Sequence, residues 1–282
     1  MGWMHDFLEY TKLDPLFKKG NHNKMTFGLT YAFSENFILV LSHDEVVHLK
    51  CSMINKMPGY PQDKFKNLKT AYTFMLGHPG RKLLFMGQEF AQFIEWNENQ
   101  QLDWMLLGYD RHAQMQEYVR RLNHLYQETP ALWEEDFSWE GFQWIVPDDS
   151  SQNVVVFLRR DKKGGEVIAV CNFAPVLRPD YKFGVPRAGQ YAELINSDAE
   201  EFGGTGQHNA PVRAKKQPMH GFDYSISLRV PPMSAVILRT PAAKPAKADG
   251  PAPKKAAARG ARAKPARKTA ARKTTGKQAK DA

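Results

Sequence analysis

Residues 36–45 read Asn-Phe-Ile-Leu-Val-Leu-Ser-His-Asp-Glu, an apolar run that ends in polar residues. A run this short, followed by polar residues, is typical of a strand buried on both faces of a parallel sheet. Residues 82–86, Lys-Leu-Leu-Phe-Met, form a second such run and are followed by Gly-Gln-Glu-Phe. We therefore predict two buried parallel strands in this part of the chain.

Helical patterns lie between and after these two runs. Apolar residues recur at spacings of three and four over residues 64–76, and His-Pro-Gly at 78–80 ends the pattern. A second pattern of this kind covers about residues 114–127. The order strand, helix, strand, helix is that of a parallel α/β unit, which we assign to residues 1–134.

The periodicity changes after residue 134. Short segments rich in β-branched and aromatic residues recur, separated by turns such as Asp-Lys-Lys-Gly-Gly at 161–165. Residues 135–240 therefore predict an antiparallel β-sandwich domain of about 100 residues, so that the chain combines an α/β part with an all-β part. The predicted strands are 142–146, 154–158, 166–171, 190–195, 224–230 and 235–238.

The charge of the chain is unevenly distributed. The 282 residues include 39 Lys+Arg and 30 Asp+Glu, but residues 241–282 hold 13 of the basic and 2 of the acidic residues. Residues 1–240 are therefore nearly neutral, which excludes a basic domain that coats nucleic acid. The tail, residues 241–282, has no aromatic residue and no Leu, Ile or Val, so we predict that it is disordered.

The tail also suggests a partner. It resembles the Lys/Ala/Pro-rich extensions of histone H1-like proteins, and counterion release would give such a segment salt-sensitive binding to nucleic acid or another polyanion. The alternative is a solvated extension that has no dedicated partner.

Two further features of the sequence bear on the cellular compartment of the protein. Cys51 and Cys171 have the spacing of neither a zinc site nor a disulfide framework, which favours a reducing compartment. The longest apolar run, 37–41, is far shorter than the roughly 20 residues that span a bilayer, and the first residues lack a signal-peptide pattern. We expect a cytoplasmic protein that does not contact a membrane.

Polar side chains follow both predicted strands. His43, Asp44 and Glu45 follow the first strand, and Glu89 follows the second. In parallel α/β folds ligands bind outside the carboxyl ends of the strands, so these side chains share one rim. They could hold a pair of sugar hydroxyls, ligate a metal or transfer protons. The alternative is that Asp44 caps a helix and His43 pairs with it.

Aromatic residues are frequent in the same part of the chain. Aromatic faces stack on sugar rings, which makes a carbohydrate groove one interpretation, and ordinary core packing is the other. The residues concerned are Trp3, Tyr31, Phe93, Trp96 and Trp104. Histidines 22, 48, 78 and 124 show no metal-ligand spacing, which favours structural or surface roles.

Several stretches in sequence order resemble one family. They include Leu-Ser-His-Asp-Glu-Val-Val-His at 41–48, Leu-Leu-Phe-Met-Gly-Gln-Glu-Phe-Ala-Gln at 83–92, Glu-Trp-Asn at 95–97 and Leu-Asp-Trp at 102–104. These stretches resemble the bacterial 1,4-α-glucan (glycogen) branching enzymes, which are (β/α)8 barrels of the α-amylase superfamily. Met-Gly-Trp-Met-His-Asp at 1–6 resembles the family segment at the end of barrel strand six. Residues 172–176, 184–186, 202–204 and 231–234 resemble its C-terminal β-domain.

The resemblance implies a partial (β/α)8 barrel, about strands six to eight, followed by the β-domain. It implies an enzyme that cuts an α-1,4 bond of a glucan and passes the cut chain to a 6-hydroxyl by a retaining double displacement, without a metal or organic cofactor. Asp44 matches the family carboxylate that binds and distorts the sugar, and His43 matches the histidine that hydrogen-bonds the same sugar. We assign Trp3, Glu45, Glu89 and Trp96 to substrate binding.

The sequence departs from the family at two catalytic positions. In the family, the nucleophile and the general acid lie at the ends of strands four and five, and both precede the segment that residues 1–6 resemble. The nucleophile strand carries an Arg-x-Asp pattern, and no such pattern precedes Ser42 in this sequence. Asp-Ala-Glu-Glu at 198–201 imitates the acid motif but lies in the β-domain, so we interpret it as a chance match. Three strands do not close an eight-stranded barrel. We therefore expect a C-terminal fragment that is inactive alone, either truncated or completed by a separate N-terminal chain.

Two other functions remain open at this point. One is an α-glucan hydrolase of the same superfamily. The other is a non-catalytic glucan-binding protein whose tail binds an anionic partner. Ser42 precedes His43 where amylases commonly carry Asn, which favours a branching enzyme over a hydrolase.

Overall fold

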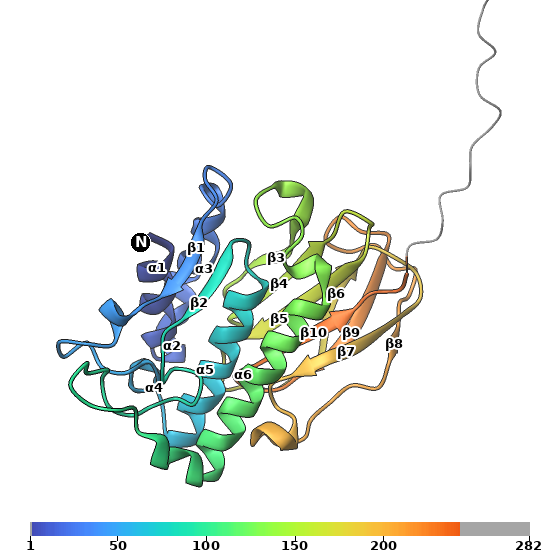
Figure 1. Ribbon diagram of the computed structural model, residues 1–282. Helices are drawn as coiled ribbons and strands as arrows, with labels where there is room; N and C mark the ends of the chain where they lie inside the picture. Colours follow the sequence, from blue (N-terminus) through green and yellow to red (C-terminus); the bar gives the residue numbers. More distant parts are fainter. Residues whose placement is uncertain (1, 243–282) are drawn as a thin grey trace, which may run out of the picture. The chain divides into compact units, whose positions relative to one another are not determined.

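The computed structural model describes residues 2–242 (Figure 1). The predicted disorder of the basic tail and its predicted polyanion partner concern residues 241–282, of which 243–282 lie outside the described residues. Within the described part of the chain, no helix has both the length and the apolar composition needed to cross a membrane.

The N-terminal part alternates helices with two short strands. The long helices contain the two segments in which the sequence showed helical spacing, and each begins a few residues earlier than predicted. The elements are α1 (Gly2–Lys12), α2 (Pro15–Lys18), α3 (Asn23–Thr26), β1 (Ile38–Leu41), α4 (Met53–Lys56), α5 (Pro61–Gly77), β2 (Arg81–Leu84) and α6 (Asp110–Glu128).

The rest of the described chain is all-β, as predicted. A six-stranded antiparallel sheet in the order β3-β4-β5-β10-β7-β8 packs against a two-stranded sheet of β6 and β9. The six predicted strands are confirmed, and β6 and β8 are two that the sequence analysis did not predict. The strands are β3 (Phe142–Asp149), β4 (Val154–Arg160), β5 (Glu166–Asn172), β6 (Arg178–Val185), β7 (Gln190–Asn196), β8 (Val212–Arg213), β9 (Tyr224–Val230) and β10 (Ser234–Arg239).

The six-stranded sheet is buried on both faces. In β4, Val155 and Phe157 belong to the core that also contains the helices, whereas Val156 and Leu158 belong to the core between the two sheets. Successive side chains of a strand point to opposite faces, so one strand contributes to both cores. Because both faces are covered, β4, β5 and β10 are nearly continuous apolar runs.

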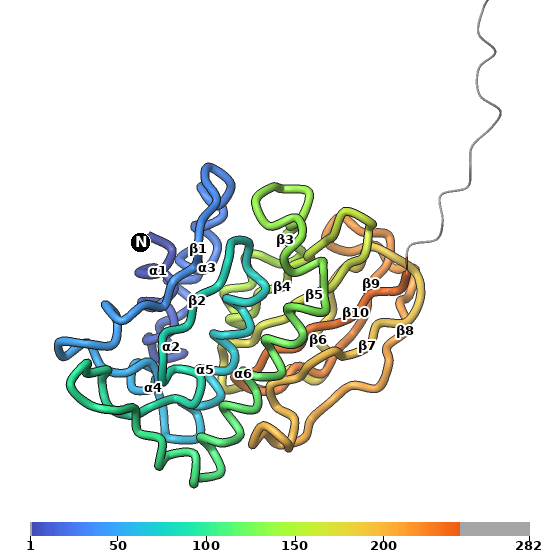
Figure 2. Tube along the Cα trace, viewed as in Figure 1, coloured from blue at the N-terminus to red at the C-terminus, as the bar shows by residue number. Residues whose placement is uncertain are grey.

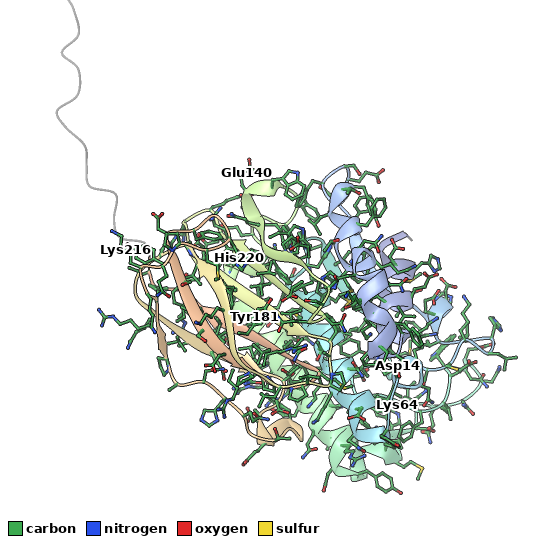
Figure 3. The ribbon with its side chains drawn as sticks, turned by 180° about the vertical axis from the view of Figure 1, so that it is seen from behind. Asp14, Lys64, Glu140, Tyr181, Lys216 and His220 are labelled. Atoms are coloured by element: carbon green, nitrogen blue, oxygen red, sulfur yellow. The ribbon has the colours of Figure 1, made fainter. Side chains whose placement is uncertain are left out.

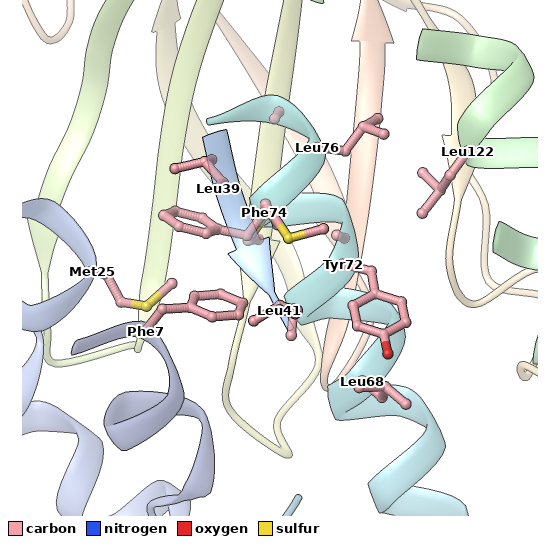
Figure 4. Packing of buried hydrophobic residues seen from close by; sticks show 14 of the residues in the cluster. Phe7, Met25, Leu39, Leu41, Leu68, Tyr72, Phe74, Leu76 and Leu122 are labelled. Atoms are coloured by element: carbon pink, nitrogen blue, oxygen red, sulfur yellow. The ribbon is translucent and has the colours of Figure 1, made fainter. Parts of the chain in front are cut away.

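Helix α5 lies against the all-β domain and is buried over most of its length. Leu68, Tyr72 and Phe74 belong to the same core as β1, α1 and the inner face of the six-stranded sheet (Figure 4). Tyr72 and Phe74 are each less than 3% exposed. The helix therefore joins the N-terminal part to the β-domain through one continuous apolar core.

Strands β1 and β2 lie side by side (Figure 2) and pair in parallel. Ile38 is opposite Arg81 in this pairing. The prediction that both strands are buried on two faces is wrong. Leu39 and Leu41 point into the core, but Ile38 is 56% exposed and Leu83 is 38% exposed. An apolar run is buried only where neighbouring layers cover it, and the face of this sheet that carries Ile38 and Leu83 is covered only in part within the described residues.

The extent of the second strand also differs from its prediction. We expected residues 82–86, but β2 ends at Leu84 and the chain turns at 86–90. The partial eight-stranded barrel and the domain boundary at residue 134 stay predictions, since two parallel strands joined by a helix occur in many α/β folds.

Buried cations connect α5 to the β-domain. Lys69 Nζ donates to the carbonyl oxygens of Ser197 at 2.8 Å and Phe202 at 2.7 Å. Arg159, fully buried in β4, donates to the carbonyl oxygen of Gly77 at 2.7 Å and pairs with Asp136 at 2.9 Å. Burial lowers the pKa of Lys69 to about 8. These bonds satisfy carbonyl groups that would otherwise be buried without partners.

We expect the Gly77→Ala substitution to destabilise the protein. A Cβ atom at Gly77 would lie 2.7 Å from the ring of Phe157, which is fully buried. Overpacking of this kind costs about 1–3 kcal/mol, against about 1 kcal/mol gained in helix propensity. Urea unfolding should show a net loss, whereas Gly20→Ala, whose Cβ meets nothing within 4 Å, should change little. Equal stabilities for the two variants would contradict the close approach of α5 to β4.

We expect His78 to make stability fall in acid. Burial lowers the pKa of His78 to about 3 from its ordinary value near 6.5. The unfolded chain therefore binds a proton between pH 6.5 and 3 that the folded chain does not, and stability is lost as the pH falls, by up to about 1.4 kcal/mol per pH unit. The measurement is the unfolding free energy against pH for the wild type and for His78→Gln, which cannot titrate. Parallel curves would contradict the prediction.

Candidate functional site at the carboxyl end of the parallel strands

The turn after β1 carries the first cluster of predicted site residues. Ser42 leaves the strand in extended conformation and His43–Glu45 form one 3-10 turn. His43 Nε2 lies 3.2 Å from Asp44 Oδ1, and Ser42 Oγ donates to Asp44 Oδ2 at 3.2 Å. The side chains of His43 and Asp44 are 51% and 57% exposed. Both can therefore reach a ligand at this rim, while their mutual contact fixes their orientation.

Two aromatic rings form a wall beside His43. The ring of Trp96 lies edge-on at 6.0 Å from the imidazole, and the ring of Phe85 lies at 5.7 Å. Phe85 and Trp96 are themselves in edge contact at 5.1 Å. This arrangement gives the rim an apolar surface next to a carboxylate, a combination that suits a sugar with its C–H faces and hydroxyl groups.

Buried Gln88 fixes the ends of β1 and β2 relative to one another. Its Nε2 donates to the carbonyl oxygen of Leu41 at 3.0 Å, and its Oε1 accepts from the amide of Phe85 at 3.3 Å. Tyr72 of α5 donates its hydroxyl proton to the Gln88 carbonyl oxygen at 3.1 Å. The position of the rim therefore depends on α5.

The loop after the turn has a strained backbone. His48, Leu49 and Cys51 have φ angles of 55°, 66° and 69°, in the left-handed region. This conformation costs a non-glycine residue about 1–2 kcal/mol. Glu95 compensates, because its two carboxylate oxygens accept from the amides of Leu49 at 3.0 Å and Cys51 at 2.6 Å. Such charge-assisted bonds are stronger than neutral ones.

Lys50 connects this loop to the turn. Its Nζ donates to the carbonyl oxygen of Asp44 at 2.7 Å and lies 3.6 Å from Glu45 Oε1. Lys56 donates in turn to the carbonyl oxygen of Lys50, and burial lowers the pKa of Lys56. Residues 43–51 and Glu95 therefore form one hydrogen-bonded unit beneath the exposed His43 and Asp44.

The other predicted binding residues occupy three different positions. Glu45 is 6% exposed and faces Lys50, so its carboxylate supports the turn from within. Glu89 is half-buried and accepts from the amide of Gly87 at 2.9 Å. Trp3 is 7% exposed and stacks on Phe7 in the core, away from the His43 ring contacts. The structure thus brings Trp96 to His43 and Asp44, but not Trp3.

The aromatic residues for which a carbohydrate groove was one interpretation do not share one set of ring contacts. Trp104 packs against Phe90, and Phe93 packs against His112. Tyr31 contacts Phe27 and Phe37. Phe93 and Trp104 are 43% and 49% exposed, so ordinary core packing does not describe these two rings, and each has a ring partner other than His43.

The acid-like segment at 198–201 has a structural role. Asp198 is 2% exposed, and its Oδ2 accepts from Thr205 Oγ1 at 2.5 Å. The segment follows β7 in the all-β domain. Across residues 2–242, no three side chains of His, Cys, Asp or Glu come together in a way that would hold a metal ion.

Sequence reasoning missed the supporting roles of Lys50, Gln88 and Glu95. Gln88 and Glu95 lay within the quoted motifs, but the bond of Gln88 to Leu41 and that of Glu95 to Leu49 each join residues more than 40 positions apart in sequence. The left-handed backbone at Leu49 and Cys51 left no sequence signal, because neither residue is glycine. Such non-local hydrogen bonds can be found only in the folded chain.

The comparisons with known proteins agree with the motifs. A family model described as the alpha amylase C-terminal all-beta domain matches residues 144–241. The chain is 51% identical over 241 residues to a 1,4-alpha-glucan branching enzyme of Halothermothrix orenii, which covers 85% of this chain and 38% of the relative. A branching enzyme of Aquifex aeolicus is 50% identical with the same coverage.

The chain spans little more than a third of the length of these curated relatives. The resemblance to bacterial branching enzymes, predicted from the motifs, is confirmed over 85% of the chain. Among solved structures, a type I pullulanase of Bacillus subtilis matches with a TM-score of 0.55 at 16% identity, over 80% of this chain and 32% of that one. An α-amylase of Halothermothrix orenii matches with a TM-score of 0.51 at 13% identity, over 85% and 48%. At these identities the likeness concerns the fold alone.

We expect Glu95→Ala to release the loop at 48–51. The amides of Leu49 and Cys51 lose their acceptor, so their hydrogen exchange should accelerate about tenfold or more. The measurement is native-state hydrogen exchange read by NMR. Glu98→Ala, which removes an exposed carboxylate three residues later, serves as the matched control and should leave both amides unchanged. Unchanged protection in Glu95→Ala would show that other contacts hold the loop.

Proposed function

We propose that residues 1–240 are the C-terminal part of a 1,4-alpha-glucan branching enzyme, an enzyme of glycogen biosynthesis that cleaves an α-1,4 bond and transfers the cut chain to a 6-hydroxyl. The observation that carries this proposal is the pair of exposed side chains, His43 and Asp44, on the turn after β1. About 50% identity to curated branching enzymes along this chain supports the same assignment.

In this proposal His43 and Asp44 bind the glucose unit at the cleavage point. The Asp44 carboxylate accepts hydrogen bonds from two hydroxyl groups of the glucose unit at the cleavage point, and His43 hydrogen-bonds the same unit. Contact with Ser42 and His43 holds the carboxylate in one orientation, which lowers the cost of binding. Trp96 and Phe85 cover an apolar face of the sugar. These interactions favour the distorted ring that precedes the transition state.

The nucleophile and the general acid come from the part of the relatives that this chain does not cover. The nucleophilic carboxylate forms a glycosyl-enzyme, and the acid protonates the leaving oxygen and later activates the 6-hydroxyl. We propose that this other part supplies six further strands and closes the barrel beside β1 and β2. The exposed outer side chains of Ile38, Leu83 and Met86 support this, because apolar sheet faces are covered in folded α/β proteins.

The lone chain is inactive in this proposal. With two parallel strands in the described part, β1 and β2 each leave an edge that is not paired to a further strand.

We also propose a cytoplasmic location for the enzyme, because Cys51 and Cys171 are both free thiols, as is usual in a reducing compartment.

We expect branching activity only when the barrel is completed. The chain should be co-expressed with the part of the Halothermothrix orenii enzyme that it does not cover. Branch formation on amylose, measured by the loss of iodine colour and by isoamylase release of new chains, should appear in the complex and be absent from either part alone. Asp44→Asn in the complex should lower the rate by about a thousandfold, since the oriented charge is lost.

Two outcomes would contradict the proposal. Branching by the lone chain that disappears in Asp44→Asn would show that the catalytic groups are within this sequence. A stable complex that hydrolyses amylose without forming branches would favour an α-glucan hydrolase. Glu201→Gln, an exposed carboxylate in the β-domain, is the matched control and should keep full activity.

A further inference from the structure

A groove of about 630 Å³ lies on the β-domain, between the turn that joins β3 to β4 and the first half of β6. Asp148 and Gln152 form one wall, and Arg178, Asp180 and Lys182 form the other. Tyr181 and His220 mark this part of the β-domain in Figure 3. The groove involves none of the residues around His43 and Asp44.

Both walls of the groove contain irregular β-structure. The pairing of β6 with β9 shifts register between Arg178 and Tyr181, and that of β3 with β4 shifts between Val146 and Asp149. Such bulges bend a strand and change the direction of its side chains, and they are frequent next to binding sites. Here they lie at the positions that place Asp148 and Asp180 on the groove.

The base of the groove is held rigidly. Asp149 accepts from Ser151 Oγ at 2.9 Å, Gln152 Nε2 at 2.8 Å and Tyr181 Oη at 2.9 Å. Arg178 donates to the carbonyl oxygen of Gln152 at 3.1 Å, which joins the two walls. Burial, and next the Asp149 charge, raise the pKa of Tyr181, so its hydroxyl keeps its proton. A groove held in this way loses little entropy on binding.

Other polar groups remain available to a ligand. Asp148 and Asp180 are exposed carboxylates, and Lys182 and His220 are exposed on the same groove. Arg178 is half-buried and already donates to the carbonyl oxygen of Gln152, so the exposed Asp180 and Lys182 are the groups that this wall offers to a ligand.

The chemistry of the lining selects the class of ligand. The free carboxylates of Asp148 and Asp180 are matched by the cations of Arg178 and Lys182, which disfavours ligands of strong net charge. Leu177 and Pro179 add an apolar surface. Carboxylates that accept from hydroxyl groups, cations that donate to them and a small apolar surface beside them fit a neutral polyhydroxylated chain. The volume is within the range of about 300–1,000 Å³ usual for small-molecule sites.

We propose that this groove binds about two or three glucose units of an α-glucan, at a distance from the cleavage site along the same or another chain. The identity of the sugar rests on the proposed function, but the binding itself needs neither Asp44 nor a completed barrel. The groove would hold a polymeric substrate near the enzyme between reaction cycles, which raises its effective concentration at the cleavage site.

The test is a titration of the complete 282-residue chain, labelled with ¹⁵N, with maltotriose and maltoheptaose. Saturable shifts are expected in the amides of residues 148–152 and 178–182. Asp180→Asn should weaken binding about tenfold, as expected for loss of a charge-assisted hydrogen bond. Glu201→Gln and Asp44→Asn should leave the affinity of the groove unchanged. The spectra themselves report whether each variant is folded.

Three results would overturn the proposal. The first is the absence of saturable shifts in the groove at about 20 mM sugar, a concentration that detects even millimolar affinity. The second is equal binding by Asp180→Asn and the wild type. The third is the same pattern of shifts with sodium phosphate, which would identify an anion site. A groove that binds maltotriose in a chain that fails to restore branching would separate this inference from the proposed function.

Discussion

The burial of α5 is the constraint on which the rest of the structure depends. Every residue from Leu68 to Gly77 is buried, although the helix carries Lys69, Thr70 and Thr73. Each polar group has a partner: the two threonines donate to carbonyl oxygens one turn earlier, and Lys69 donates to the β-domain. A helix with polar side chains can be buried only when such hydrogen bonds offset the desolvation of those side chains. The stability of α5 therefore depends on the position of the β-domain, which supplies the acceptors for Lys69.

The candidate site depends on this helix through a short chain of contacts. Tyr72 of α5 fixes the carbonyl group of Gln88, and Gln88 fixes the end of β1 through Leu41. The turn that carries His43 and Asp44 begins at the next residue. A shift of α5 would therefore move the rim, whereas a change in the exposed loops would not move α5. The rigid β-domain core thus supports a site to which it contributes no side chain.

Much of the fold could be predicted from the sequence, for reasons that individual elements make clear. The strands β4, β5 and β10 were predictable because burial on both faces requires apolar residues at every position. The same rule failed for Ile38 and Leu83, which are exposed. An apolar sequence indicates that a strand is stable when other elements cover it, but it does not show that this chain supplies those elements. Strand β6 was missed because its first half, Arg-Pro-Asp, is a bulge with a polar sequence. His43 and Asp44 were predictable from their place after a strand, but Glu95 acts through non-local bonds that have no local pattern.

The two parts of the described chain differ in how completely the faces of their sheets are buried. In the β-domain, the inner faces of both sheets are covered, and the buried Arg159 has a charged partner in Asp136 and carbonyl acceptors in Gly77 and Gly141. In the parallel part, one face of β1 and β2 is exposed and their apolar side chains contact water. A self-sufficient core can carry a binding groove by itself, because no further chain is needed to shape it. A sheet with an open face is different: Ile38 and Leu83 stay exposed until another surface covers them, so in the proposed function the site at Asp44 is completed by a second surface at this rim.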